Sequence, residues 1–140
     1  MFEAAYATDY SYTDVRESIG ETYDDVSLTT VFEVDPWDTN LYEDASDEMI
    51  DNMETKEILY HHHSYGVKTS TYNKYSSLSS AFTIVQTYPA LIDGATVDIV
   101  TAVEHKNYPI VGTQYHPEKN PFIYYPYITV PHSEEAIDMT

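Results

Sequence analysis

Three β-rich runs lie close together in the second half of the chain, and they constrain its fold most. They are FTIVQTY at 82–88, TVDIVTAVEH at 96–105 and PIVGTQYH at 109–116. The first two runs predict an antiparallel hairpin joined by a long loop, PALIDGA. Pro117 has no N–H to donate to a strand ladder, so the third run is expected to end before it. His116 is therefore predicted at a strand end, where a sheet presents side chains to a cleft.

Helices are expected around these strands, which makes the predicted fold class α/β. Residues 46–59, SDEMIDNMETKEIL, predict a helix with Ser46 as N-cap and two acidic residues in the first turn. Ser133 is the expected N-cap of a last helix, followed by Glu134 and Glu135. Residue propensities predict further helices at 2–8 and 70–81. They also predict extended structure at 25–34.

The charge of the chain is strongly negative and unevenly distributed. The 140 residues carry a net charge of -18, and 17 of the 24 acidic residues fall in residues 1–57. Such a field repels nucleic acid and anionic membranes, so neither is expected as a partner. No apolar run approaches the ~20 residues that cross a bilayer, and no signal peptide is expected in the chain as written. The length predicts one domain with one core.

His116 and Glu118 could together form an acid–base pair. The carboxylate of Glu118 can reach the His116 ring across Pro117 in extended chain and hold one ring nitrogen as a donor. The other nitrogen could then take a proton from a nucleophile. The chain has no cysteine, so it offers neither a thiolate nor a disulfide. From spacing alone, a purely structural pair is the default interpretation.

A second group of histidines occurs in YHHHSYG, residues 60–66. In a strand, His61 and His63 share one face while His62 lies on the other. Two histidines on one face could begin a zinc site, but no third ligand follows at a supporting spacing. A polar strand end is the simpler interpretation, and a histidine that points into a substrate cleft is a third one. The remaining candidate, His132, is adequately explained by a helix start.

Three strings taken together resemble a known family. GTQYHPEKNPF, HHSYG and PHSEEAI resemble gamma-glutamyl hydrolase, which cleaves folate poly-γ-glutamates and belongs to the class I glutamine amidotransferase superfamily. The pattern G-x-Q-aromatic-H-P-E is typical of the superfamily, whereas E-K-N-P-F is more specific to the hydrolases. The resemblance implies a flavodoxin-like α/β sheet with mixed strands and an antiparallel hairpin.

The same resemblance implies roles for individual residues. His116 resembles the general base, Glu118 the acid that orients it, and His63 a histidine near the substrate. The implied mechanism is attack by a cysteine thiolate on a γ-glutamyl amide, without metal or cofactor. The start MFE resembles the residues just after the family's Cys-Leu-Gly turn. Residues 1–140 are therefore expected to form one partial domain, equivalent to the second half of the enzyme and lacking its nucleophile.

Three functions follow as hypotheses. The favoured one is a gamma-glutamyl hydrolase part that acts on folyl or antifolate poly-γ-glutamates, is inactive alone and depends on a missing N-terminal half. The second is a non-catalytic folate-binding or γ-glutamyl-binding module or scaffold remnant. The third is the glutaminase half of an amidotransferase, which the E-K-N-P-F string disfavours. The resemblance implies a vacuolar, lysosomal or extracellular location.

Overall fold

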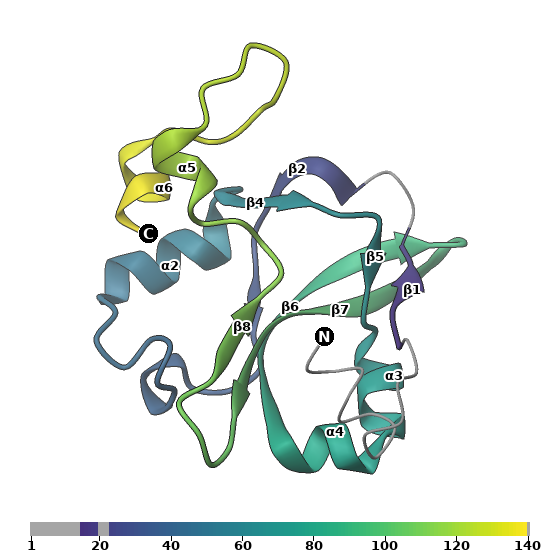
Figure 1. Cartoon of the computed structure of the whole chain (residues 1–140). Coiled ribbons are helices and arrows are strands. Elements are labelled where there is room, and N and C mark those ends of the chain that lie inside the picture. Colours follow the sequence, from purple (N-terminus) through teal and green to yellow (C-terminus); the bar gives the residue numbers. More distant parts are fainter. Residues whose placement is uncertain (1–14, 20–22, 140) are drawn as a thin grey trace.

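A long antiparallel hairpin forms the centre of the fold. The computed structural model describes residues 15–19 and 23–139 (Figure 1), so the helix predicted at 2–8 lies outside the described residues. Strand β6 (Phe82–Ile92) pairs with β7 (Ala95–His105) along the whole of both strands. The predicted antiparallel hairpin is therefore confirmed.

The prediction of a long loop between the two strands of this hairpin is wrong. The strands continue to Ile92 and restart at Ala95, so only two residues turn the chain. Asp93 and Gly94 have φ angles of 51° and 79°. Two successive residues with positive φ make the tight turn that suits the twist of a hairpin, and Asp-Gly is a preferred pair for it. Pro89 lies within β6, opposite Asp98, without ending the strand.

The hairpin is the middle of a four-stranded sheet with the order β3-β6-β7-β8. Its outer strands are β3 (Val31–Phe32) and β8 (Val111–Thr113). Two small sheets flank it, one of β1 (Glu17–Ser18) with β5 (Tyr65–Gly66) and one of β2 (Asp24–Leu28) with β4 (Leu59–His62). Every strand pair in the described residues is antiparallel.

The helices confirm the α/β class. Helix α2 (Asp47–Thr55) begins as predicted, because the Ser46 hydroxyl accepts the N–H of Met49 at 3.1 Å. It ends four residues earlier than expected, since Leu59 already belongs to β4. The Ser133 hydroxyl caps α6 (Glu134–Asp138) in the same way. The other helices within the described residues are η2 (Pro36–Asp38), α3 (Thr69–Lys74), α4 (Ser76–Ala81) and α5 (Lys119–Phe122).

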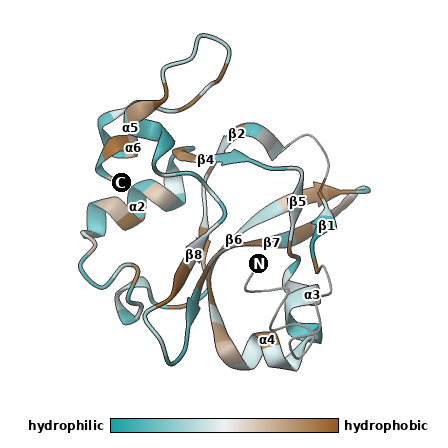
Figure 2. Ribbon diagram, in the orientation of Figure 1, coloured by the Kyte–Doolittle hydropathy of each residue, from teal (hydrophilic) through white to brown (hydrophobic). Residues whose placement is uncertain are grey.

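The core is divided between the two sides of the hairpin. On one side α2 and α6 pack against the sheet through Met53, Leu59, Val85 and Ala136. On the other side α3 and α4 cover it through residues such as Leu78. Figure 2 shows the hydrophobic stretches on the central strands and on the helices that face them. In the part of the chain that the structure describes, no helix has the length and apolar character needed to cross a membrane.

The close packing around Gly66 explains why the HHSYG string ends in glycine. A Cβ atom at this position would lie 2.8 Å from Cγ2 of Ile99, which is closer than real contacts allow. The missing side chain lets β5 lie directly against β7.

Candidate functional site

His116 and Glu118 meet in a turn between β8 and α5. Nδ1 of His116 lies 2.9 Å from Oε1 of Glu118. The prediction that the strand 109–116 continues to His116 is wrong, because β8 ends at Thr113. Glu118 has helical backbone angles as the N-cap of α5. The two side chains meet across this bend instead of along a strand. The backbone N–H of His116 donates to the carbonyl of Tyr60 at 2.8 Å, which holds the turn against β4.

This contact determines which nitrogen of His116 is available. An ionised carboxylate only accepts hydrogen bonds, so Nδ1 carries the proton and Nε2 is left with a lone pair. Burial raises the pKa of Glu118, but hydrogen bonds from His116 and its own backbone and the charges of His116 and Lys119 outweigh this and lower it. The side chains are 36% and 63% exposed. A ligand can therefore reach this pair, and Nε2 can act as a base.

A second pair is made of two histidines, the fully buried His61 and the partly buried His63. Nδ1 of His61 is 2.8 Å from Nε2 of His63, while His62 points the other way, 3.3 Å from Asp25. The predicted alternation of the three rings is thus confirmed. The His61 ring is fully buried and packs against Tyr88 and Tyr115.

His61 is electrically neutral in this environment. Burial, together with smaller contributions from the charges of His63 and His116, lowers its pKa to about 3. The structure therefore brings His61, His63 and His116 together, although they lie on two separate segments. No group of three or more His, Asp or Glu side chains in residues 15–19 and 23–139 is arranged to hold a metal ion.

A buried chain of hydroxyl groups fixes the residue before His116. The Tyr115 hydroxyl lies 2.5 Å from that of Tyr42, which in turn donates to Oε1 of Gln86 at 2.8 Å. Burial raises the pKa of Tyr115 to about 12, and burial also raises that of Tyr42. Both groups are therefore neutral donors. One signal for this network is present in the sequence, the aromatic residue before His-Pro-Glu, but nothing there indicates its partners.

Asn120 anchors the segment after the pair, and sequence reasoning missed it. Its side chain is fully buried and donates from Nδ2 to the carbonyls of Ala136 and Ile58, at 2.8 and 3.3 Å. The backbone carbonyl of Asn120 accepts a hydrogen bond from Nδ1–H of His132 at 2.6 Å. Asn120 therefore ties α5 to α6 and to the chain before β4. His132 serves this support, in agreement with the prediction that structure explains it.

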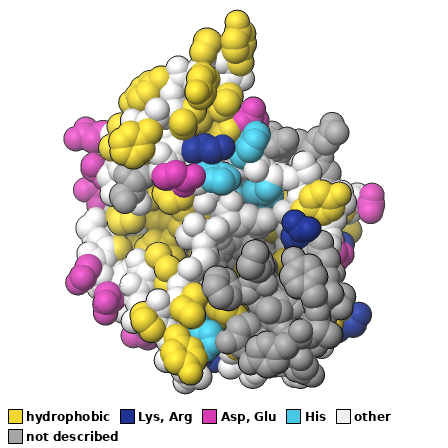
Figure 3. Space-filling view, in the orientation of Figure 1, with side chains coloured by type: hydrophobic (Ala, Val, Ile, Leu, Met, Phe, Trp, Pro, Cys, Tyr) yellow, Lys and Arg dark blue, Asp and Glu magenta, His cyan; other side chains and the backbone are white. Residues whose placement is uncertain are grey.

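Figure 3 shows histidine, basic and acidic side chains gathered in one area of the surface. Above them an uncharged loop protrudes, with the exposed aromatic residues Phe122, Tyr124, Tyr125 and Tyr127. Lys119, the first residue of α5, has its Nζ 4.9 Å from the centroid of the Tyr60 ring.

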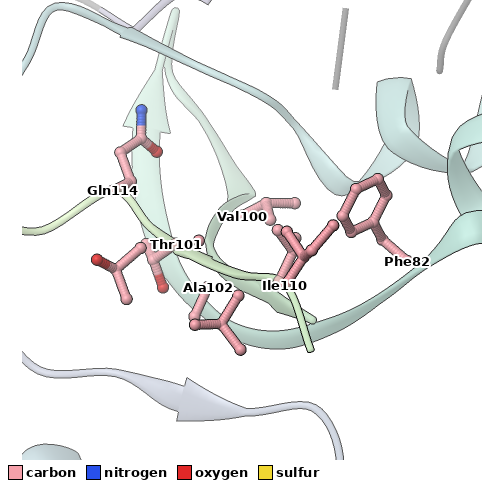
Figure 4. Close-up of a pocket in the computed structure, with 10 residues that line it drawn as sticks. Phe82, Val100, Thr101, Ala102, Ile110 and Gln114 are labelled. Carbon is pink, nitrogen blue, oxygen red and sulfur yellow. The ribbon is translucent and has the colours of Figure 1, made fainter. Parts of the chain in front are cut away.

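A separate pocket of about 240 Å³ lies along β7 and β8 (Figure 4). Phe82, Val100 and Ile110 make its apolar part, and the Gln114 amide lies at the other end. Gln114 also donates from Nε2 to the carbonyl of Tyr65 at 2.8 Å. His116 and Glu118 do not line this pocket. The candidate site is therefore the more open surface around the His116–Glu118 pair and the His61–His63 pair.

The class of the protein follows from a family comparison. A model of the class-I glutamine amidotransferase family matches residues 20–124, a range that contains His63, His116 and Glu118. The chain belongs to this family, and its α/β fold agrees with the family's architecture.

Relatives of known name narrow the class further. Gamma-glutamyl hydrolase 1 of Arabidopsis thaliana is 35% identical over 103 residues, which is 74% of this chain and 28% of the relative. Gamma-glutamyl hydrolase 2 of the same plant is 32% identical over 93 residues, or 66% and 26%. Gamma-glutamyl hydrolase B of Dictyostelium discoideum is 28% identical over 89 residues, or 64% and 25%.

Within the class-I family this chain is therefore a gamma-glutamyl hydrolase-like member, as the resemblance of its motifs predicts. The matched region spans only about a quarter of the length of these relatives.

Proposed function

We propose that the chain carries the general-base part of a γ-glutamyl hydrolase site. In this proposal His116 is the base, Glu118 orients it, and His63 lies near the substrate. The observation that supports it most directly is the 2.9 Å contact between Nδ1 of His116 and Glu118, in a partly exposed turn that leaves Nε2 for a ligand. Membership of a family with hydrolase relatives supports the reaction class.

The proposed reaction needs a thiol from outside these 140 residues, which hold no cysteine. Nε2 of His116 takes the thiol proton, and the thiolate attacks the carbonyl carbon of a γ-glutamyl amide. The C–N bond then breaks, and His116 returns the proton to the amine, which leaves as glutamate or a γ-glutamyl peptide. Water deprotonated by the same nitrogen then cleaves the thioester, which releases the shortened folyl γ-glutamate as a carboxylic acid, and His116 returns the proton to the thiol.

Glu118 has an electrostatic task in this sequence. Each proton transfer makes His116 an imidazolium ion, and a carboxylate 2.9 Å from Nδ1 stabilises that charge. The lowered pKa of Glu118 keeps the carboxylate ionised at neutral and mildly acidic pH. The contact that orients His116 would therefore persist at mildly acidic pH. A vacuolar, lysosomal or extracellular location is part of the proposal.

The proposed substrates are folyl or antifolate poly-γ-glutamates. We expect no nucleic-acid or membrane partner, because the net charge of -18 repels both polyanions and anionic lipids. An N-terminal half that supplies the thiol and the oxyanion donors is part of the proposal. Without it, the 140-residue chain is expected to show no turnover.

A hydrolysis assay on folyl poly-γ-glutamate tests this proposal. It compares the 140-residue chain with one extended at its N-terminus through a segment that carries the family's Cys-Leu-Gly turn. We expect turnover only from the extended chain, and a loss of about 10³-fold or more in kcat for its His116→Ala variant. Turnover by the 140-residue chain, or an unchanged rate in His116→Ala, contradicts the proposal. Glutamine serves as the alternative substrate that a glutaminase half would prefer.

The absence of cysteine also favours a second function, a non-catalytic γ-glutamyl-binding module. The same two chains distinguish it. A binding module takes up the ligand in both forms and hydrolyses it in neither, even when the extended chain is folded and its thiol is reduced.

A further inference from the structure

A groove of about 320 Å³ lies between helices α2 and α6, which lie side by side in Figure 1. Glu48 and Asn52 line it from α2, and Glu134 and Asp138 line it from α6. The members of each pair are four residues apart, a spacing that puts two side chains on one face of a helix. The groove is therefore bordered by two helix faces that carry acidic and polar side chains.

Asn52 is the buried polar residue of this groove. It is 8% exposed and lies within α2, although asparagine is a poor helix former. In the described part of the chain its side-chain amide makes no hydrogen bond, and a buried amide without a partner costs free energy. Folding alone therefore gives no reason for an asparagine at this position, and its amide is available to a ligand in the groove.

The helices explain only some of the carboxylates around Asn52. Glu48 and Glu134 lie in first turns, where a negative charge is favourable. Asp138 lies at the opposite end of α6, where a negative charge is unfavourable, and it follows Glu134 at a spacing at which like charges repel. Within the described residues, none of these three carboxylates forms an ion pair within 4.0 Å. Three unpaired negative charges therefore border one groove.

The other features of the groove restrict the class of ligand. The fourth carboxylate, Glu135, is already paired with Lys56 at 2.7 Å. Among the described residues no aromatic side chain lines the groove, so a flat cation has no ring to stack on. The acidic side chains of the same residues are not arranged around a single metal ion. Met49 adds a flexible apolar wall, which suits a methylene chain.

We propose that this groove binds a linear aliphatic polyamine. Its ammonium groups bind the carboxylates of Glu48, Glu134 and Asp138, and one of them also donates to the amide oxygen of Asn52. An ammonium group has three hydrogen-bond donors, and carboxylate and amide oxygens accept them. The separated charges of a polyamine match carboxylates on two facing helices better than one compact ion does. The inference is independent of the proposed function, since the proposed catalytic pair does not line the groove.

Titration calorimetry of the 140-residue chain with spermidine, at about 0.15 M salt, tests the assignment. We expect one site per chain, and Glu48→Gln should weaken binding about tenfold because a charge-assisted hydrogen bond is lost. Glu54→Gln is the matched control, since it removes the same charge from the same helix but lies outside the groove. Its affinity should stay within about twofold of wild type, because distant exposed charges are screened by salt.

A variant without a change in net charge tests the buried amide. Asn52→Leu should weaken spermidine binding about tenfold, although the negative field of the chain is unaltered. Circular dichroism checks that this variant is folded. If it is not, the comparison of Glu48→Gln with Glu54→Gln decides, because both side chains are exposed.

Three further titrations test the class of ligand. Propylamine has one ammonium group and should bind much more weakly than spermidine. Neither Mg²⁺ nor trilysine should show the dependence on Glu48 and Asn52 that spermidine shows. The assignment is overturned if the wild-type chain does not bind spermidine, if Glu48→Gln and Glu54→Gln weaken binding equally, or if a folded Asn52→Leu variant binds normally. Trilysine that binds as tightly as spermidine and loses affinity in the same variants would indicate a site for a basic peptide and would also overturn it.

Discussion

Two pairs of side chains, His116 with Glu118 and His61 with His63, lie close together in this molecule and differ in almost every property. His116 is partly exposed and bonded to a carboxylate, Glu118. His61 is fully buried and bonded to another histidine, His63. A carboxylate stabilises the imidazolium form of its partner, whereas burial beside a second imidazole opposes that form. The same side chain is therefore suited to proton transfer in one pair and to neutral support in the other.

The difference shows why a count of histidines is a poor guide to chemistry. The HHH string is the more conspicuous signal, yet its first ring is held neutral by burial and its second points away from the other two. The less conspicuous His-Pro-Glu string makes the accessible pair. Each pair can be tested separately, because one should control stability and the other activity.

The largest expected effect on stability comes from His61, the fully buried member of the His61–His63 pair. His61→Ala should lower the free energy of unfolding by about 3 kcal/mol, because it opens a cavity between Tyr88 and Tyr115 and removes the partner of His63. His116→Ala should cost about 1 kcal/mol or less, since a partly exposed ion pair contributes little. Urea unfolding of the two variants makes the measurement. Equal losses would show that the two pairs do not differ as the structure indicates.

The pH dependence of stability should sharpen the same contrast. The pKa of His61 is about 3 in the folded chain and about 6.5 when unfolded, so only the unfolded state takes up a proton between these values. Its contribution is complete above about pH 6.5 and is lost as the pH falls, by up to about 1.4 kcal/mol per unit. Burial raises the pKa of the neighbouring Tyr88 and Tyr115, so neither titrates in this range.

Glu118 acts in a different pH window, which allows the two pairs to be separated. Its pKa is lowered, so its contribution is present above about pH 4.5 and is lost only below it. The contribution of His61 is therefore measured as the difference between wild type and a His61 variant in urea unfolding between about pH 5 and 6.5. The His61→Gln variant should be less stable at neutral pH and show a flatter pH profile. An unchanged slope in this variant would mean that His61 is not buried as a neutral ring.

The sequence was informative where a local signal sufficed. Ser46 and Ser133 predicted the starts of two helices, and alternation in the HHH string predicted which rings share a face. The sequence predicts the hairpin but not its tight turn, because Pro89 lies within β6 and only Asp93 and Gly94 turn the chain. Paired strands can tolerate a proline, whereas two positive φ angles have few alternatives to Asp-Gly.

Long-range contacts could not be predicted in the same way. Asn120 is 16 residues from Ala136 and 62 from Ile58, and Tyr115 is 73 from Tyr42. Nothing in the local sequence identifies these partners, since they become neighbours only when α2, α6 and the hairpin pack together. The His116–Glu118 contact was predicted for an extended segment and occurs in a turn instead. The residue types were sufficient to suggest the pair, whereas its geometry depended on α5.

The smallest expected effect concerns a single proton on His116. Glu118 accepts from Nδ1 and so selects the tautomer with a lone pair on Nε2. Glu118→Ala removes this preference, while Glu118→Gln keeps an acceptor oxygen and should retain part of it. Nitrogen-15 NMR of the imidazole at neutral pH distinguishes the tautomers, and the His61 ring in the same spectrum is an internal reference that should not change. If His116 already carries its proton on Nε2 in the wild-type chain, then Glu118 does not orient it. In that case the distinction between a catalytic and a supporting pair loses its physical basis.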